Sequence, residues 1–224
     1  ELIEGVLITF VDVTAMAAVE EQQRLLVAEL NHRVRNMLQV VIGLAHQTLR
    51  RSQSLQDFEP AFMGRMQALG RAYEPLSRDG WSNVPMAQLL ATQLDPFAIE
   101  GRRYTGVGEQ VVIASAAALS LGLILYELAT NATKYGALST AGGKVDVSWQ
   151  LADGGNGTEE FVLLWQESGG PPVRPPGRSG FGTELVQRQL HYELNGTAAM
   201  DFEPDGLRVT LAIPAKHVVV ESRS

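Results

Sequence analysis

The sequence lacks cysteine and an excess of positive charge. Without cysteine, its 224 residues can form neither a disulfide framework nor a thiolate metal site. This fits a reducing compartment, and we expect a cytoplasmic protein. The formal net charge is −7, so the composition gives no electrostatic case for binding nucleic acid or an anionic membrane. The chain begins at Glu1 rather than at a methionine, so we expect it to be a piece of a longer protein, and we expect no signal peptide in it.

A long uninterrupted hydrophobic run is also missing. Residues 111–129 are nearly long enough to span a bilayer, but two serines, a glycine and Glu127 interrupt them. Charged side chains are costly inside a membrane. We therefore expect no membrane span in this stretch, but a short strand followed by a buried helix over 115–135.

Enough apolar sequence is present for a hydrophobic core, at 45% of the residues. Residues 5–14 are rich in β-branched side chains and predict a strand, whose partners we expect upstream. Hydrophobic residues then recur at alternating spacings of three and four over 15–50 and, after a polar turn at 51–57, up to about residue 77. Two such helices joined by a short loop predict an antiparallel hairpin. The two seams are Val27, Leu30, Val34, Met37, Val41, Leu44 and Thr48, and Phe62, Met66, Leu69, Tyr73 and Leu76.

Residues 77–83 break this pattern and predict a domain boundary. Asn83 can cap a helix that has Pro85 in its first turn and runs to about residue 94. Helices mixed with antiparallel runs of strands predict an α+β fold, in which a helical hairpin precedes an α/β sandwich with helices on one face of a mixed sheet. The strands are expected near 110–113, 144–151, 160–166, 197–203 and 207–213, and a further helix over 181–193.

The helix expected over 115–135 carries polar side chains that a core helix does not need. Glu127, Asn131 and Lys134 are spaced i, i+4 and i+7 and share one face. A solvated face is one explanation. The other is a nucleotide–metal site, because an amide oxygen suits Mg²⁺, an ammonium group neutralises phosphate and a carboxylate can receive a proton.

Two glycine-containing segments are weaker candidates for a nucleotide site. In WQESGGP, Glu167 ends a strand and could accept a hydrogen bond from an exocyclic amine, while Gly169 and Gly170 allow close approach. In SGFGTEL, Gly180 and Gly182 precede a helix whose free N–H groups can face phosphate. An ordinary turn and an ordinary helix entry explain the same residues.

A histidine lies in ELNHRVRNML on the first long helix. His32 is two positions past the seam residue Leu30, about 200° round the helix, so it points outward. A lone exposed histidine usually has no special role. Its imidazole could nevertheless serve as a nucleophile, and Asn36 lies one turn later on the same face.

Taken in chain order, four segments resemble the HWE-type sensor histidine kinases, close relatives of the HisKA-2 group. They are ELNHRVRN, LYELATNATKYGALS, LWQESGGP and SGFGTELVQRQL, and the resemblance covers about residues 23–214. It implies a signalling helix and phosphoacceptor hairpin over 15–80 and a GHKL-type catalytic domain over 81–216 that binds ATP and Mg²⁺. Residues 1–14 resemble the terminal strand of a PAS sensor domain, and 217–224 form a tail.

The resemblance also implies roles for individual residues. His32 is the phosphoacceptor, and Glu127, Asn131 and Lys134 form the N box, with Asn131 as the Mg²⁺ ligand and Lys134 near phosphate. Glu167 recognises the adenine amine, and residues 171–179 form a short ATP lid. The other residues implied in nucleotide binding are Tyr135, Gly169, Gly170, Gly180, Phe181, Gly182 and Thr183.

Two positions depart from the family pattern. The N-box histidine that contributes to the family name is replaced by Tyr126, although Trp165 and Glu167 keep the Trp–x–Glu motif. In the larger histidine kinase class an acidic residue follows the phosphoacceptor and accepts its proton, whereas Arg33 follows here. Glu29 and Glu127 are the two candidate proton acceptors, and the sequence does not choose between them.

The resemblance implies a protein-histidine kinase of a two-component system, which phosphorylates His32 from ATP and passes the phosphoryl group to an aspartate of a response regulator. The hairpin favours a homodimer, with a monomer as the alternative. Tyr126 and Arg33 leave two rivals open. One is a non-catalytic signalling scaffold with a degenerate nucleotide site, and the other is a GHKL ATPase or serine kinase.

Overall fold

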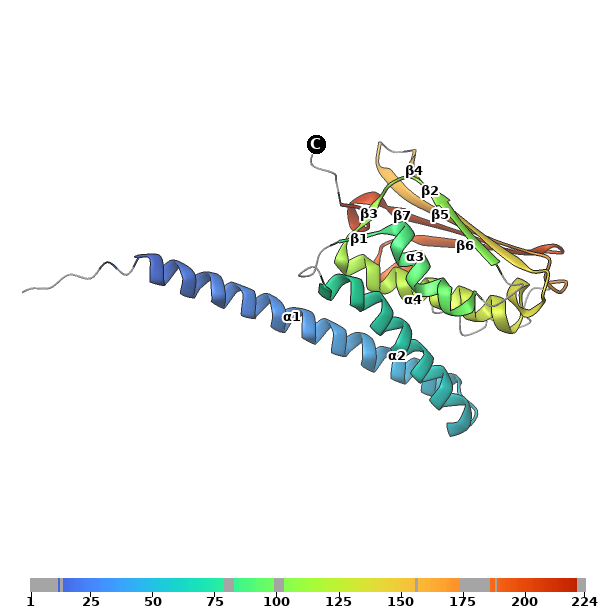
Figure 1. The fold of residues 1–224 in the computed structure, drawn as a ribbon, viewed down its shortest axis with the longest axis horizontal. Helices are drawn as coiled ribbons and strands as arrows, with labels where there is room; N and C mark the ends of the chain where they lie inside the picture. Colours follow the sequence, from blue (N-terminus) through green and yellow to red (C-terminus); the bar gives the residue numbers. More distant parts are fainter. Residues whose placement is uncertain are drawn as a thin grey trace, which may run out of the picture. The chain divides into compact units, whose positions relative to one another are not determined.

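The computed structural model of the protein describes residues 12, 14–78, 83–98, 103–155, 157–173, 186–187 and 189–220 (Figure 1). The chain divides into two compact units, residues 1–52 and 53–224. Most of the strand predicted over 5–14 lies outside the described residues, and its last residue, Thr14, already begins a helix. Residues 181–185 and 188 of the helix predicted over 181–193 also lie outside them. The last part of that predicted helix is a short π-helical turn, η3 (Gln189–Glu193).

The first unit contains one long helix, α1 (Thr14–Arg51), which confirms the helix predicted over 15–50. Near its end, side-chain hydroxyl groups donate hydrogen bonds to backbone carbonyl groups of the helix. The hydroxyl of Thr48 donates to the carbonyl of Leu44 at 2.6 Å, and that of Ser52 donates to the carbonyl of Thr48 at 2.9 Å. Such side-chain bonds compete with continuation of the helix, and α1 ends there.

The second unit opens with α2 (Leu55–Arg78), the second predicted helix. Ser54 caps it: its hydroxyl accepts from the backbone N–H of Asp57 at 3.1 Å and donates to the Asp57 carboxylate at 2.7 Å. This is a reciprocal N-terminal cap, so the polar turn stops at Ser54. The antiparallel packing of α1 against α2 stays a prediction.

A mixed five-stranded sheet forms the body of the second unit and confirms the predicted α+β class (Figure 1). The order is β2-β4-β5-β7-β6; β2 runs parallel to β4, and the remaining pairs are antiparallel. Strand β2 was not predicted from the sequence, because its glycines lower its strand propensity. The strands are β2 (Arg103–Gly108), β4 (Lys144–Asp153), β5 (Glu159–Ser168), β6 (Thr197–Glu203) and β7 (Gly206–Pro214).

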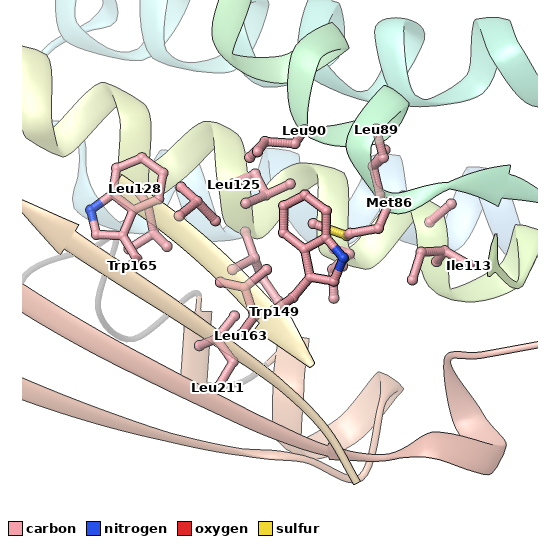
Figure 2. Close-up of a cluster of buried hydrophobic side chains, with 14 of the residues drawn as sticks. Met86, Leu89, Leu90, Ile113, Leu125, Leu128, Trp149, Leu163, Trp165 and Leu211 are labelled. Carbon is pink, nitrogen blue, oxygen red and sulfur yellow. The ribbon is translucent and has the colours of Figure 1, made fainter. Parts of the chain in front are cut away.

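The core lies between one face of this sheet and the helices α3 (Met86–Leu94) and α4 (Ser115–Lys134) (Figure 2). Alternate residues of β4 and β5 are buried, as the period of a strand requires: Val145, Val147, Trp149, Phe161, Leu163 and Trp165. In the described part of the chain α4 is a helix long and apolar enough to cross a membrane. Most of it is buried inside the protein, so it serves as a core helix, as predicted.

The predicted cap of α3 is wrong. Residues Val84–Pro85 form a strand, β1, that pairs with β3 (Val112–Ile113), and α3 begins only at Met86. The residue before a proline avoids helical backbone, which favours the extended pairing. The side-chain oxygen of Asn83 instead accepts from the backbone N–H of Ser115, the first residue of α4, at 3.2 Å.

Candidate functional site

The second half of α4 presents the predicted polar stripe with graded exposure. Glu127 is 2% exposed, Asn131 is half-buried and Lys134 is exposed. The Lys134 ammonium is close enough to lower the pKa of the Glu127 carboxyl. The helix thus carries one of these side chains into the protein and leaves the amide and the ammonium group at the surface.

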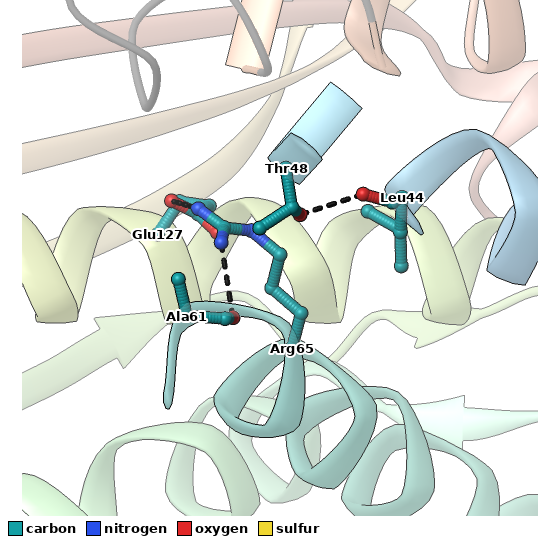
Figure 3. A network of polar contacts seen from close by, with 5 residues as sticks. All are labelled: Leu44, Thr48, Ala61, Arg65 and Glu127. Atoms are coloured by element: carbon teal, nitrogen blue, oxygen red, sulfur yellow. Dashed lines mark hydrogen bonds and ion pairs between the residues drawn. The ribbon is translucent and has the colours of Figure 1, made fainter. Parts of the chain in front are cut away.

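Glu127 does not lie on a solvated face, because it pairs with an arginine of α2 (Figure 3). The Nε of Arg65 lies 2.8 Å from Glu127 Oε1, and its Nη2 donates to Oε2 at 3.2 Å. Burial raises the pKa of Glu127, and the guanidinium opposes that rise. The explanation by a solvated face is therefore wrong for this residue. No spacing rule connects positions 65 and 127, so sequence reasoning missed Arg65.

Glu167 is held in a second buried site at the end of β5, where it is 1% exposed. The backbone N–H of Ala137 donates to its Oε2 at 2.8 Å, and the indole N–H of Trp165 donates to its Oε1 at 3.2 Å. Burial raises the pKa of this carboxyl, and the two donors oppose the rise. Trp165 and Glu167 are two positions apart on one strand and share a face, which gives the Trp–x–Glu motif a physical purpose.

The glycines after Glu167 bring this strand end against the segment that follows α4. Gly169 has φ +71°, a conformation that favours glycine. A Cβ atom at Gly170 would lie 2.6 Å from the Cα of Ala137, so a side chain there would collide with the backbone. The hydroxyl of Thr140 donates to the carbonyl of Gly169 at 2.8 Å.

The junction between the two motifs is also tight on the side of α4. Any Cβ atom at Gly136 would overlap Glu167 Oε2, so only glycine fits there. Tyr135, which ends α4, is 74% exposed. The structure therefore places the ends of α4 and β5, and with them Lys134 and Glu167, on either side of one short segment.

Several predicted site residues lie outside the described part of the chain. These are Gly180, Phe181, Gly182 and Thr183, together with most of the predicted lid over 171–179. His32 and Glu29 belong to α1, whose backbone is helical at both positions, but their side chains lie outside the described part. Their predicted roles stay predictions.

The described residues contain no group of three or more histidine, cysteine or acidic side chains suited to hold a metal ion. Mg²⁺ is usually bound by one or two protein oxygens together with substrate phosphates, so this does not argue against it. The half-buried amide of Asn131, one turn before the exposed Lys134, is a suitable hard ligand at such a site.

Comparison with known proteins finds histidine kinases that are similar to this chain in sequence and in fold. Residues 29–110 match the sequence model of the HWE histidine kinase family. A blue-light-activated histidine kinase of Brucella anthropi is 38% identical over 205 residues, which make up 91% of this chain and 42% of that protein. One of Brucella ovis, with the same description, is 33% identical over 204 residues, again 91% of this chain and 42% of that protein.

A solved blue-light activated histidine kinase of Erythrobacter litoralis has the same fold, with a TM-score of 0.58 and 19% identity over 85% of this chain and 62% of that one. The chain is thus similar to the HWE histidine kinase family over residues 29–110, and to blue-light-activated histidine kinases over 91% of its length. It spans less than half the length of the curated relatives it matches.

Proposed function

We propose that this chain is the kinase core of a two-component sensor. It binds ATP with Mg²⁺ between the ends of α4 and β5, phosphorylates His32, and passes the phosphoryl group to an aspartate of a response regulator. The observation that supports this most strongly is the hydrogen bond, 2.8 Å long, from the backbone N–H of Ala137 to Glu167 Oε2. It holds the Glu167 carboxylate beside the segment that follows Lys134. Two motifs 30 residues apart, each weak alone, meet there.

Each part of the proposed nucleotide site has a suitable chemical group. A carboxylate oxygen has two lone pairs, so Glu167 can accept from the adenine amine as well as from Trp165 and Ala137. Gly170 lets the strand end pack directly on the backbone of Ala137, and Lys134 can neutralise phosphate. Asn131 supplies an oxygen for Mg²⁺, which would reduce the negative charge on the phosphates.

The proposed phosphoryl transfer forms one bond to the γ-phosphorus and breaks another. A ring nitrogen of neutral His32 attacks the γ-phosphorus, an N–P bond forms, and the bond from that phosphorus to the β–γ bridging oxygen breaks. ADP leaves with the bonding electrons. The proton on the other ring nitrogen passes to a carboxylate, for which Glu29 and Glu127 are the two candidates.

Labelled ATP tests this proposal directly. Incubation of the chain with γ-labelled ATP and Mg²⁺ should give a phosphorylated protein whose label is lost in acid and kept in base, the behaviour of phosphohistidine. Label that is stable in acid would indicate a serine kinase, and hydrolysis without any labelled protein would indicate an ATPase. Failure to bind a fluorescent nucleotide would leave the scaffold as the function.

The affinity for Mg²⁺-bound ATP should fall at low pH through Glu167. Its ionised form is the better acceptor, and because burial raises its pKa, protonation begins at a higher pH than for an ordinary glutamate. Replacing Trp165 by phenylalanine removes a donor to the ionised form, so the pH at which affinity is half-lost should move upward. Titration calorimetry over a pH series measures that midpoint.

Two further variants complete this experiment. Glu167→Gln should bind about tenfold more weakly at high pH and lose the Glu167 contribution to the pH dependence. Trp149→Phe is the matched control, because it removes an indole N–H bond of 2.8 Å to the Glu109 carbonyl without touching Glu167. Equal midpoints for Trp165→Phe and Trp149→Phe would contradict the assigned role of Glu167.

We also propose that α1 is covered by a second copy of the chain. Several large apolar side chains of α1 are at least 45% exposed: Val27, Leu30, Val34, Leu38, Ile42 and Leu49. Pairing such helices in a dimeric bundle would bury them. Sedimentation equilibrium should accordingly report a dimer, and a monomer mass would contradict it.

The remaining assignments are proposals too. We assign residues 15–80 to the signalling helix and phosphoacceptor region, 81–216 to the catalytic domain and 217–224 to a tail. Residues 1–14 would be the terminal strand of a PAS-like sensor domain. The absence of cysteine supports action in the cytoplasm, where ATP is available.

A further inference from the structure

The α2 helix docks on α4 through small side chains that let the two helices approach closely. Gly64, Ala68 and Ala72 are spaced by four residues and share one face of α2. A Cβ atom added at Gly122 of α4 would lie only 2.8 Å from the Cβ of Ala72. Beside this contact, the amide of Gln93 on α3 donates to the Ala68 carbonyl at 3.2 Å. We name this contact between α2 and α4 the docking seam.

Tyr126 closes the docking seam at its other end. Its hydroxyl occupies the space that a side chain at Gly64 would need. The centroid of its ring lies 5.7 Å from the guanidinium carbon of Arg71 and 5.8 Å from the ring centroid of Phe97. The residue that stands in place of the N-box histidine thus packs against α2.

The ion pair of Arg65 and Glu127 belongs to the same seam. Each Glu127 oxygen lies within 3.2 Å of a guanidinium nitrogen, and the carboxylate side chain is 3% exposed. Arg65 is itself held by the bond from its Nη1 to the Ala61 carbonyl, 3.0 Å long. A carboxylate covered in this way is shielded from an approaching imidazole; burial raises its pKa, and the adjacent guanidinium opposes that rise.

The nucleotide side of α4 is not covered by α2. Lys134 and Tyr135 are exposed, and Asn131 is half-buried. The docking seam ends at Tyr126 and Glu127, at least one helical turn before these residues. Docking of α2 is therefore compatible with nucleotide binding and incompatible with access of a phosphoacceptor to Glu127.

We propose that the docking seam is an autoinhibitory contact, in which Arg65 and Tyr126 hold α2 on α4 and keep Glu127 away from the phosphoacceptor until α2 is released. This rests on the proposed kinase function, with Glu127 taking part in the transfer to His32. Release of α2 controls the rate of phosphorylation and leaves the affinity for Mg²⁺-bound ATP unchanged.

A reversible crosslink across the seam tests this without removing any site residue. The chain has no cysteine, so Ala72→Cys with Gly122→Cys creates a single possible intramolecular disulfide. The 2.8 Å between the two Cβ positions is shorter than the roughly 3.5–4.5 Å of a disulfide, so the helices need to move slightly apart. The oxidised protein should bind Mg²⁺-bound ATP normally but phosphorylate slowly, and reduction should restore the rate.

The reduced form of the same protein is the internal control for folding. An oxidised protein that phosphorylates as fast as the reduced one overturns the proposal, and a faster one shows that docking activates. No phosphohistidine in either form would instead contradict the proposed function. The two failures are thus distinguishable.

Loosening the seam should have the opposite effect. The methyl group of Gly64→Ala would press on the Tyr126 hydroxyl, so phosphorylation at saturating ATP should become several-fold faster. Adding Tyr126→Phe removes that hydroxyl and should bring the rate back down. Gly70→Ala is the matched control, because it makes the same exchange on α2 at a position with no atom within 4 Å of the new methyl.

Arg65→Gln tests the ion pair itself. It keeps a hydrogen-bond donor and removes the charge that weakens Glu127 as a base, so the phosphorylation rate should rise while the dissociation constant for Mg²⁺-bound ATP stays the same. If this variant keeps its circular dichroism spectrum but phosphorylates more slowly, Arg65 supports the reaction and the autoinhibitory role is overturned.

Discussion

Replacing His32 by alanine should reduce phosphorylation of the protein from γ-labelled ATP to background. Imidazole is the nucleophile of the proposed transfer, and alanine offers none. The affinity for Mg²⁺-bound ATP should not change, since the proposed nucleotide site lies on α4 and β5. Autoradiography measures the first quantity and titration calorimetry the second.

His46→Ala is the matched control for this experiment. His46 lies on the same helix, α1, and its side chain is exposed, so the substitution has the same chemical character with little structural consequence. It should leave the labelling unchanged. Persistent labelling of His32→Ala, or equal loss in both variants, would show that the phosphoacceptor is assigned to the wrong residue.

Replacing Asn131 by alanine should remove most of the Mg²⁺-dependent affinity for ATP, by about tenfold or more. The amide oxygen is the proposed metal ligand, and alanine cannot provide one. Alanine is a better helix former than asparagine, so α4 should remain folded. Calorimetry with Mg²⁺ and with EDTA separates the metal-dependent part of the binding free energy from the rest.

Thr133→Ala provides the control for that measurement. Its hydroxyl donates to the Ala129 carbonyl at 2.9 Å, within the same helix, so its removal touches no proposed ligand. We expect the affinity of this variant for ATP to be unchanged both with Mg²⁺ and with EDTA. An Asn131→Ala variant that retains the full Mg²⁺ effect would exclude the N-box assignment, whatever its activity.

Local regularities made much of this fold predictable from the sequence. The helices predicted over 15–50 and from the end of the polar turn at 51–57 to about residue 77 follow the helical period, and the bounds of α1 and α2 lie within a few residues of those limits. The antiparallel strands β4, β5, β6 and β7 were expected because alternation and turn residues mark them. The parallel edge strand β2 was missed, because Gly106 and Gly108 lower its strand propensity. Gly106 has no room for a side chain beside Leu90, which is a requirement of packing.

In the candidate site, too, residues in local motifs could be predicted from the sequence and their long-range partners could not. Glu127, Asn131, Lys134 and Glu167 were found because each belongs to a short motif with a helical or strand spacing. Their partners were not found. Asn83 was expected to cap α3 but instead accepts from the first backbone N–H of α4, since pairing of β1 with β3 holds residues 84–85 extended.

The sequence alone determined the class of fold and the candidate residues for a nucleotide site, because spacing along one helix or strand dictates which side chains share a face. Only the tertiary structure decided that Glu127 is buried against Arg65 and that Tyr126 meets Gly64. These contacts join residues about 60 positions apart, and such contacts arise when helices pack, which no local period encodes.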